Sequence, residues 1–166
     1  NEAYNSYRKF TVVRNPYDRI VSWYFYLKKE MEKEHIRGDW RWSSGEHLPS
    51  SFKEWVKDPM KDYYPKWKLS DIHNSLHTNL ELNNNGREHG VPLLSPQYAW
   101  LDDTVEVLKY ESLNEDINEF FGKKIDLPMR NKTDKDNYIN YYDKKTLDVV
   151  YNRYEEDFNK YKYKKL

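Results

Sequence analysis

The sequence predicts a single α/β domain over residues 1–166, and three observations support this prediction. The chain is long enough, at 166 residues, to bury one hydrophobic core. Aromatic residues make up 17% of it, a content that a disordered chain would not have. Two short β-branched runs are each followed at once by the start signal of a helix, which is the order of elements that builds α/β domains.

The composition excludes several classes of protein. Lys and Arg together number 28, as do Asp and Glu, so the net charge is zero. A generally basic nucleic-acid binder is therefore not indicated, and any anion-binding site must come from a local group of residues. The absence of cysteine excludes a disulfide scaffold, a thiolate metal site and a Cys nucleophile, and it favours a reducing compartment such as the cytoplasm. No apolar run approaches the roughly 20 residues of a membrane helix. The first residue is Asn rather than Met, so the absence of a targeting segment leaves the compartment open.

The first predicted elements are a buried strand over residues 10–13 and a helix from about residue 16 to about residue 33. Asn15 is a good N-cap, and Pro16 suits the first helical position, where its missing N–H costs nothing. Apolar residues recur beyond it with helical spacing: Tyr17, Ile20, Val21, Tyr24 and Leu27.

The middle of the chain is less regular. Gly, Ser and Pro break residues 36–50, and the capping-box spacing of Ser51 and Glu54 then predicts a short helix that ends near Pro59. Residues 70–82 look weakly helical, and the Asn/Gly run at 83–86 ends that element. A loop is expected from there to about residue 92.

The second strand is predicted over residues 104–110, followed by a helix through Phe121. Ser112 and Glu115 have capping-box spacing, and Gly122 is the expected C-cap. Because both strands lead directly into helices, we expect them to be parallel neighbours in one sheet. Typical sheets have about 4–6 strands, so the parallel sheet is predicted to be incomplete at the amino end. The remaining strands are expected either upstream of residue 1 or within the aromatic segments.

The last helix is predicted to follow a polar loop over residues 126–142 and to be capped by Asp143. Its apolar stripe consists of Leu147, Val150, Tyr151, Tyr154, Phe158 and Tyr161.

Arg14 and Ser22 are the candidate binding residues. Arg14 follows the first strand, at the end where open α/β sheets bind ligands, and the N-terminus of the next helix offers N–H groups and a positive dipole end. The planar guanidinium suits phosphate, and the Ser22 hydroxyl lies farther along the helix. Together they could hold one phosphate or sulfate group. The alternative is an ordinary salt bridge for Arg14 and chance packing for Ser22, and the residues alone leave both open.

The stretch 14–24, in which Arg14 is followed by Ser22, resembles the 3′-phosphate-binding motif of sulfotransferases that use 3′-phosphoadenosine 5′-phosphosulfate (PAPS). Residues 107–113 resemble the late strand of that family and its Glu-x-Leu turn. The segments 95–98, 127–133, 141–143 and 154–158 are similar to parts of the carbohydrate-type and bacterial branch. The resemblance therefore runs from about Phe10 to the end of the chain.

The resemblance implies a three-layer α/β/α P-loop-like fold in which Arg14 and Ser22 bind the 3′-phosphate of the nucleotide. PAPS would be the co-substrate and adenosine 3′,5′-bisphosphate (PAP) the product, with no metal. Arg130 and Lys132, with Lys135, lie in a basic loop near the end of the chain, of the kind that closes over the nucleotide in the family. A cluster of solvated charges without a binding role is an equally good interpretation of these residues. The acceptor is a hydroxyl group, and the branch favours that of a sugar.

The sequence also departs from the family pattern. The family has a loop rich in Gly, Ser and Thr that binds the 5′-phosphosulfate, and a catalytic His or Glu that usually lies upstream of the Arg–Ser motif. Only residues 1–13 precede Arg14, and they contain no such loop. The resemblance therefore predicts that an amino-terminal portion is missing from these 166 residues and that this chain alone transfers no sulfuryl group at a useful rate. The catalytic residues stay unassigned.

The histidines are weaker candidates. His73, His77 and Glu81 would share one face of a helix, a geometry that can bind zinc, but nothing else in the sequence supports a metal and a solvated face is favoured. The remaining three lie in polar segments, where a surface position is favoured over a role as catalytic base: His35, His47 and His89.

Aromatic residues between the two predicted strands could form the acceptor side, where rings suit sugar or aryl faces, or could serve as ordinary packing. These residues are Trp40, Trp42, Trp55, Tyr63, Tyr64 and Trp67. Two other functions follow from such residues. One is a non-catalytic glycan-binding module that uses exposed Trp and Tyr, which the order of the family-like motifs disfavours. The other is a single-stranded nucleic-acid binder, which the zero net charge disfavours.

Overall fold

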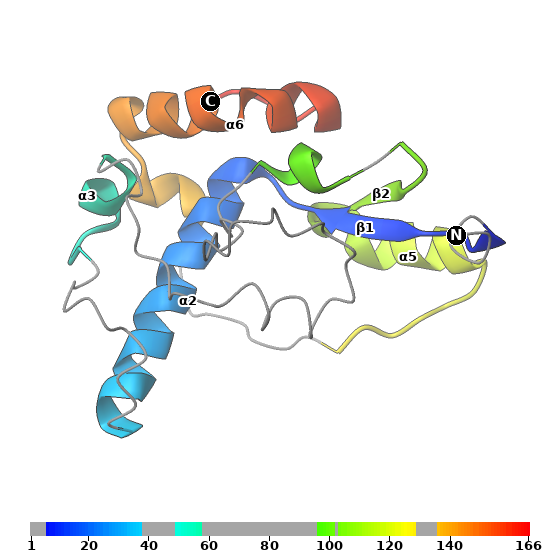
Figure 1. Ribbon diagram of the computed structural model, residues 1–166, viewed down its shortest axis with the longest axis horizontal. Coiled ribbons are helices and arrows are strands. Elements are labelled where there is room, and N and C mark those ends of the chain that lie inside the picture. The colour runs from blue at the N-terminus through cyan, green and yellow to red at the C-terminus, as the bar shows by residue number, and fades with distance from the viewer. Residues whose placement is uncertain (1–5, 38–48, 58–95, 102, 129–135) are drawn as a thin grey trace, which may run out of the picture.

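The computed structural model describes residues 6–37, 49–57, 96–101, 103–128 and 136–166 (Figure 1). Its strands are β1 (Phe10–Val13) and β2 (Glu106–Lys109). Its α-helices are α2 (Pro16–Arg37), α3 (Phe52–Lys57), α5 (Leu113–Phe121) and α6 (Lys144–Tyr161). Three 3₁₀ turns complete the described elements: η1 (Gln97–Trp100), η2 (Tyr110–Ser112) and η3 (Tyr138–Tyr141).

The two strands pair in parallel, as the sequence predicts, and form a mixed α/β structure with the helices. Thr11 pairs with Val107, and Val13 pairs with Lys109. Parallel strands end at the same edge of a sheet, so the residues that follow Val13 and Lys109 come together there. The second strand is shorter than predicted, because residues 103–105 form a turn and bend and Tyr110 already belongs to η2.

Helix α5 packs against the sheet through a small apolar cluster. Leu108 of β2 is buried with Ile117 and Phe120 of α5. The ring of Phe10 on β1 lies 4.8 Å from that of Phe120, measured between centroids. Helix α5 thus packs against β2, the strand that precedes it, and against Phe10 of β1.

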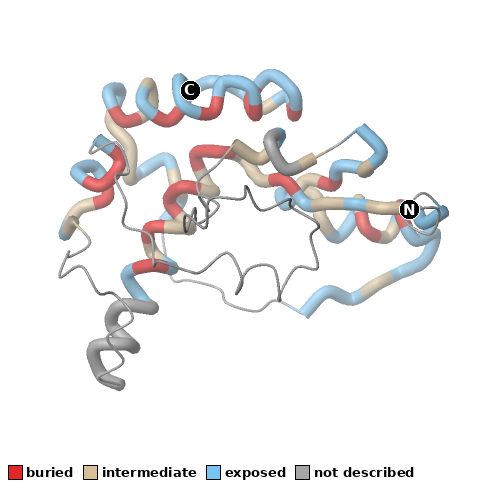
Figure 2. Tube along the Cα trace, viewed as in Figure 1, coloured by how far each residue is buried: buried red, intermediate tan, exposed pale blue. Residues whose placement is uncertain are grey.

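The main core lies between helices α2, α3 and α6 rather than on the sheet. Figure 2 shows buried positions along α2, α3 and the side of α6 that faces them. Among them are Tyr17, Ile20, Val21, Tyr24, Leu27, Phe52, Trp55, Val56, Val150, Tyr154 and Phe158. The predicted stripe of the last helix therefore faces the core. Trp55 is only 1% exposed and lies 5.5 Å from the Tyr24 ring, so it packs the core and offers no face to a glycan.

Three predicted helix starts are confirmed by their capping bonds. The Asn15 Oδ1 accepts the Tyr17 N–H at 2.9 Å where α2 begins, and the Ser51 Oγ accepts the Glu54 N–H at 3.2 Å before α3. Asp143 and Thr146 form a reciprocal capping box at α6. Helix α2 extends to Arg37, beyond the predicted end near residue 33.

The start of α5 differs from the prediction in its chemistry. The helix begins at Leu113, but the Ser112 side chain makes no capping bond, because η2 runs directly into α5 and the Leu113 N–H donates to the Tyr110 carbonyl. The Asp116 carboxylate instead accepts the Lys109 N–H at 2.8 Å. Gly122 is the predicted C-cap, with φ of 63°.

Other predictions meet the structure only in part. The segment predicted as a loop over 126–142 contains η3. The weak helix over 70–82 and the loop to residue 92 lie outside the described residues. None of the described helices is long and apolar enough to cross a membrane.

Candidate anion-binding site

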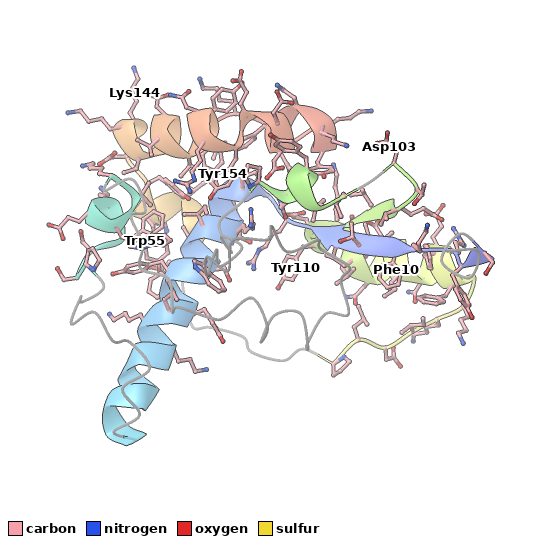
Figure 3. All side chains as sticks on the ribbon, viewed as in Figure 1. Phe10, Trp55, Asp103, Tyr110, Lys144 and Tyr154 are labelled. Carbon is pink, nitrogen blue, oxygen red and sulfur yellow. The ribbon has the colours of Figure 1, made fainter. Side chains whose placement is uncertain are left out.

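The candidate site lies at the carboxyl edge of the sheet, where the β1–α2 turn meets the start of η2. Arg14 and Asn15 form the turn, and Tyr110 follows β2. Tyr110 is labelled in Figure 3 and is 50% exposed. The parallel pairing of the strands brings these two segments together, although Arg14 and Tyr110 lie 96 positions apart in the sequence.

The Arg14 guanidinium is held from three directions. Its Nε and Nη2 lie 2.7 and 2.6 Å from the Asp18 Oδ2, and its Nη1 donates to the Ser22 Oγ at 3.0 Å. The carbon at the centre of the guanidinium lies 4.2 Å from the centroid of the Tyr110 ring, within cation–π distance. Arg14 therefore makes the salt bridge of the alternative interpretation, and it also contacts Ser22.

The arrangement leaves donors for an anion. A guanidinium carries five N–H bonds, of which three have partners among the described residues, so one N–H remains on each of Nη1 and Nη2. The Ser22 oxygen accepts from Arg14 and keeps its own hydrogen to donate. The Arg14 side chain is 21% exposed, so a ligand can reach it. Because Asp18 balances the charge of Arg14, directed donors rather than net charge would select the anion.

The N-terminus of α2 is less available than the sequence predicts. The Asn15 N–H donates to the Glu111 Oε1 at 2.7 Å, and the Tyr17 N–H donates to the Asn15 Oδ1 at 2.9 Å. Pro16, between them, has no N–H. These main-chain groups are thus occupied by the protein itself, and the expectation of free N–H groups at these positions is wrong. An anion at this edge of the sheet would therefore have to be bound by side chains, for which Arg14 and Ser22 are the candidates.

Two residues whose roles the sequence reasoning missed support Arg14. The Gln97 Oε1 accepts the Arg14 N–H and the Gln97 Nε2 donates to the Arg14 carbonyl, both at 2.9 Å. The Asp157 carboxylate, fully buried in α6, accepts the N–H groups of Gln97 and Tyr98, each at 2.8 Å. One local signal could have identified Asp157, because a charged residue three positions after Tyr154 falls on the apolar face of the last helix.

The end of the chain also reaches the site. The Tyr163 hydroxyl donates to the Glu111 Oε2 at 2.9 Å, so Glu111 connects Tyr163 to the Asn15 N–H. Burial, with the nearby Glu111 carboxylate as a further cause, raises the pKa of Tyr163 well above its ordinary value. Tyr163 therefore stays protonated at neutral pH and keeps donating to Glu111.

Several predicted candidates lie outside the described residues. Arg130, Lys132 and Lys135 are among them, as are the side chains of all five histidines. The same holds for five of the six aromatic candidates between the strands: Trp40, Trp42, Tyr63, Tyr64 and Trp67. Within the described ranges, no three His, Cys, Asp or Glu side chains gather as ligands of a metal ion would.

Comparison with known proteins places the chain in a family. No curated protein and no solved structure gives a significant match. The sequence model of the Sulfotransferase family, in contrast, matches residues 1–164, which is nearly the whole chain. Family membership implies transfer of a sulfuryl group from a nucleotide donor to an acceptor, and the Arg14–Ser22 pair lies inside the matched region. The chain belongs to the sulfotransferase family.

Proposed function

We propose that this chain binds PAPS through Arg14 and Ser22 and serves transfer of the sulfuryl group to a sugar hydroxyl, within a three-layer α/β/α P-loop-like fold. The observation that carries the proposal is the contact between the Arg14 Nη1 and the Ser22 Oγ, at 3.0 Å, beside the carboxyl edge of two parallel strands. Ligands of open α/β sheets bind at this edge. The parallel pairing of β1 with β2 and the packing of α5 against that sheet support the layered fold.

The chain's own residues would hold the 3′-phosphate. Arg14 offers one N–H from each of Nη1 and Nη2, and Ser22 offers its O–H, so neighbouring side chains supply three donors. A hydrogen bond to a charged group contributes about 1.5–3 kcal/mol. Asp18 and Tyr110 fix the plane of the guanidinium, which reduces the freedom that Arg14 loses when a ligand binds.

The rest of the reaction needs other groups. PAPS supplies a sulfuryl group that the acceptor oxygen attacks in line, while the acceptor hydroxyl loses its proton to a base. The base stays unassigned. Arg130 and Lys132 are proposed to close over the nucleotide. The sugar acceptor rests on the resemblance of the carboxyl-terminal segments to the carbohydrate-type branch.

Nucleotide binding is the first test, because a glycan-binding module has no need of a nucleotide. Titration calorimetry would compare PAP with adenosine 5′-monophosphate (AMP), which lacks the 3′-phosphate. We define the 3′-phosphate preference as the Kd for AMP divided by the Kd for PAP, and we expect a value of about ten or more. Equal binding of the two nucleotides would contradict the site, and binding of oligosaccharides without any binding of nucleotide would favour the glycan-binding module.

The acceptor is tested with radiolabelled PAPS and a panel of oligosaccharides and phenols. Because residues 1–166 alone are expected to transfer slowly, the reaction is run at high protein concentration, with Arg14→Ala as the control. Labelled oligosaccharide that depends on Arg14 supports the sugar acceptor. Label found only on phenols would contradict that part of the proposal while leaving the donor site intact.

A further inference from the structure

We propose that Gln97 and Asp157 are positioning residues of the anion site: Asp157 fixes Gln97, and Gln97 fixes the main chain of Arg14. The inference rests on the proposed function, because the effect is read through binding of the 3′-phosphate. Neither residue needs to touch the nucleotide.

Gln97 holds Arg14 by both of its main-chain polar groups. Its carboxamide oxygen accepts the Arg14 N–H and its carboxamide nitrogen donates to the Arg14 carbonyl, both at 2.9 Å. Two residues of a hydrogen-bonded antiparallel pair exchange bonds in the same way. The Gln97 side chain thus makes the two main-chain hydrogen bonds to Arg14 that a residue of a neighbouring strand would make. A carboxamide in this orientation satisfies both groups, whereas a carboxylate has no donor and an ammonium no acceptor.

Asp157 in turn holds Gln97. Its Oδ2 accepts the Gln97 N–H and its Oδ1 accepts the Tyr98 N–H, each at 2.8 Å, which anchors the first residues of η1. The Gln97 Nε2 lies 3.5 Å from the same Oδ2, so the Asp157 charge also favours the orientation of the carboxamide that places its nitrogen there. A buried carboxylate is costly unless it is well satisfied, and the Arg19 Nη1 at 4.0 Å supplies a nearby positive charge.

The consequence for binding follows from the length of the Arg14 side chain. The guanidinium lies at the end of that chain, so a small rotation of the Arg14 main chain displaces it by a larger amount. Asp18, Ser22 and Tyr110 contact the guanidinium, whereas Gln97 fixes the main chain from which it extends. Loss of Gln97 should therefore misplace donors to the 3′-phosphate more than it affects the rest of the nucleotide.

Gln97→Glu tests this role with little change in shape. The variant keeps one oxygen for the Arg14 N–H but replaces the donor to the Arg14 carbonyl with a second oxygen, which also faces Asp157. We expect the 3′-phosphate preference to fall about fivefold, with the Kd for AMP nearly unchanged. A merely structural role would weaken PAP and AMP together and leave the preference intact.

Two further variants keep the test decisive. Gln97→Met removes both polar atoms at similar length, and it should lower the preference as Gln97→Glu does. Asn118→Ala is the matched control, because the Asn118 Oδ1 accepts the Ile125 N–H at 2.6 Å, a bond of the same kind in α5 that does not involve Arg14. The control should keep the wild-type preference.

All variants are compared at a temperature at which circular dichroism shows them folded. If the wild-type protein prefers PAP and folded Gln97→Glu and Gln97→Met keep that preference, the positioning role is refuted and the proposed function stands. If the wild-type protein itself shows no preference, the proposed function fails and the positioning role fails with it.

Discussion

The Arg14 Nη1 donates to the Ser22 Oγ at 3.0 Å, two turns along the helix that Arg14 precedes. Asp18, which accepts from the Arg14 Nε at 2.7 Å, lies midway between them in the sequence. Residues four apart on a helix share a face, so Asp18 and Ser22 line the same side of α2 and the Arg14 side chain lies along it. The spacing of the three residues in the sequence therefore produces the geometry directly.

Replacing Ser22 should weaken the site less than replacing Arg14. Ser22→Ala removes a neutral hydroxyl donor, so the 3′-phosphate preference should fall about threefold to tenfold, as measured by titration with PAP and AMP. Ser22→Thr keeps the hydroxyl and is the matched variant, with a preference close to the wild-type value. A Ser22→Ala protein with an unchanged preference would exclude Ser22 as a ligand of the 3′-phosphate.

Tyr110 should act through its ring. The Arg14 guanidinium lies over that ring at 4.2 Å, and a cation–π contact at an exposed position contributes about 0.5–1 kcal/mol. Tyr110→Ala should therefore lower the 3′-phosphate preference about twofold to fivefold, whereas Tyr110→Phe should retain it. An equal loss in both variants would instead assign the effect to the hydroxyl.

Asp143 should stabilise the fold in a pH-dependent way. The hydrogen bond from the Thr146 N–H, followed by that from the Thr146 hydroxyl, lowers the pKa of the Asp143 carboxyl. Because the pKa of Asp143 is lower in the folded state than in the unfolded chain, the ionised carboxylate stabilises the fold at pH values above the ordinary Asp pKa of about 3.9. This stabilisation is lost as the pH falls through the lowered pKa of the folded state. Asp143→Ala should lower the Tm by about 2–4 °C at pH 7, because the N-cap is lost.

The difference in Tm between wild type and Asp143→Ala should narrow as the pH falls below about 4. Asp148→Ala is the control, because Asp148 lies inside the same helix, half exposed, and caps nothing. It should change the Tm less at pH 7. A Tm difference for Asp143→Ala that stays constant with pH would show that the carboxylate charge is not what stabilises the start of α6.

The parts of the fold that local signals determine could be predicted from the sequence. The β-branched run 10–13, the Asn15 cap and the Pro16 start are properties of neighbouring residues, and all three are present in the structure. The expectation that the strand is buried is wrong except at Val13, because Phe10 and Val12 are exposed on this two-stranded sheet. The parallel pairing of the two strands could also be predicted, because each strand leads directly into a helix. The Arg14–Ser22 contact belongs to the same class, since one helix sets the distance between the two residues.

The remaining features depend on contacts between distant segments. Gln97 meets Arg14 across 83 positions and Asp157 across 60, so no local pattern connects them. Glu111 accepts the Asn15 N–H across 96 positions, so the sequence could not show that this N–H is occupied. Ser112 has capping-box spacing but makes no capping bond, because it already belongs to the 3₁₀ turn that leads into the helix.

The 3′-phosphate preference of Arg14→Ala, measured by titration calorimetry with PAP and AMP, tests the central claim most directly. Loss of a charged hydrogen-bond donor should lower the affinity for PAP about tenfold to a hundredfold, with a much smaller change for AMP. Arg8→Ala is the control, because Arg8 is exposed and pairs with Glu106 near the opposite end of β1. The account predicts that the preference is lost in Arg14→Ala and kept in Arg8→Ala. An undiminished preference in Arg14→Ala would contradict it.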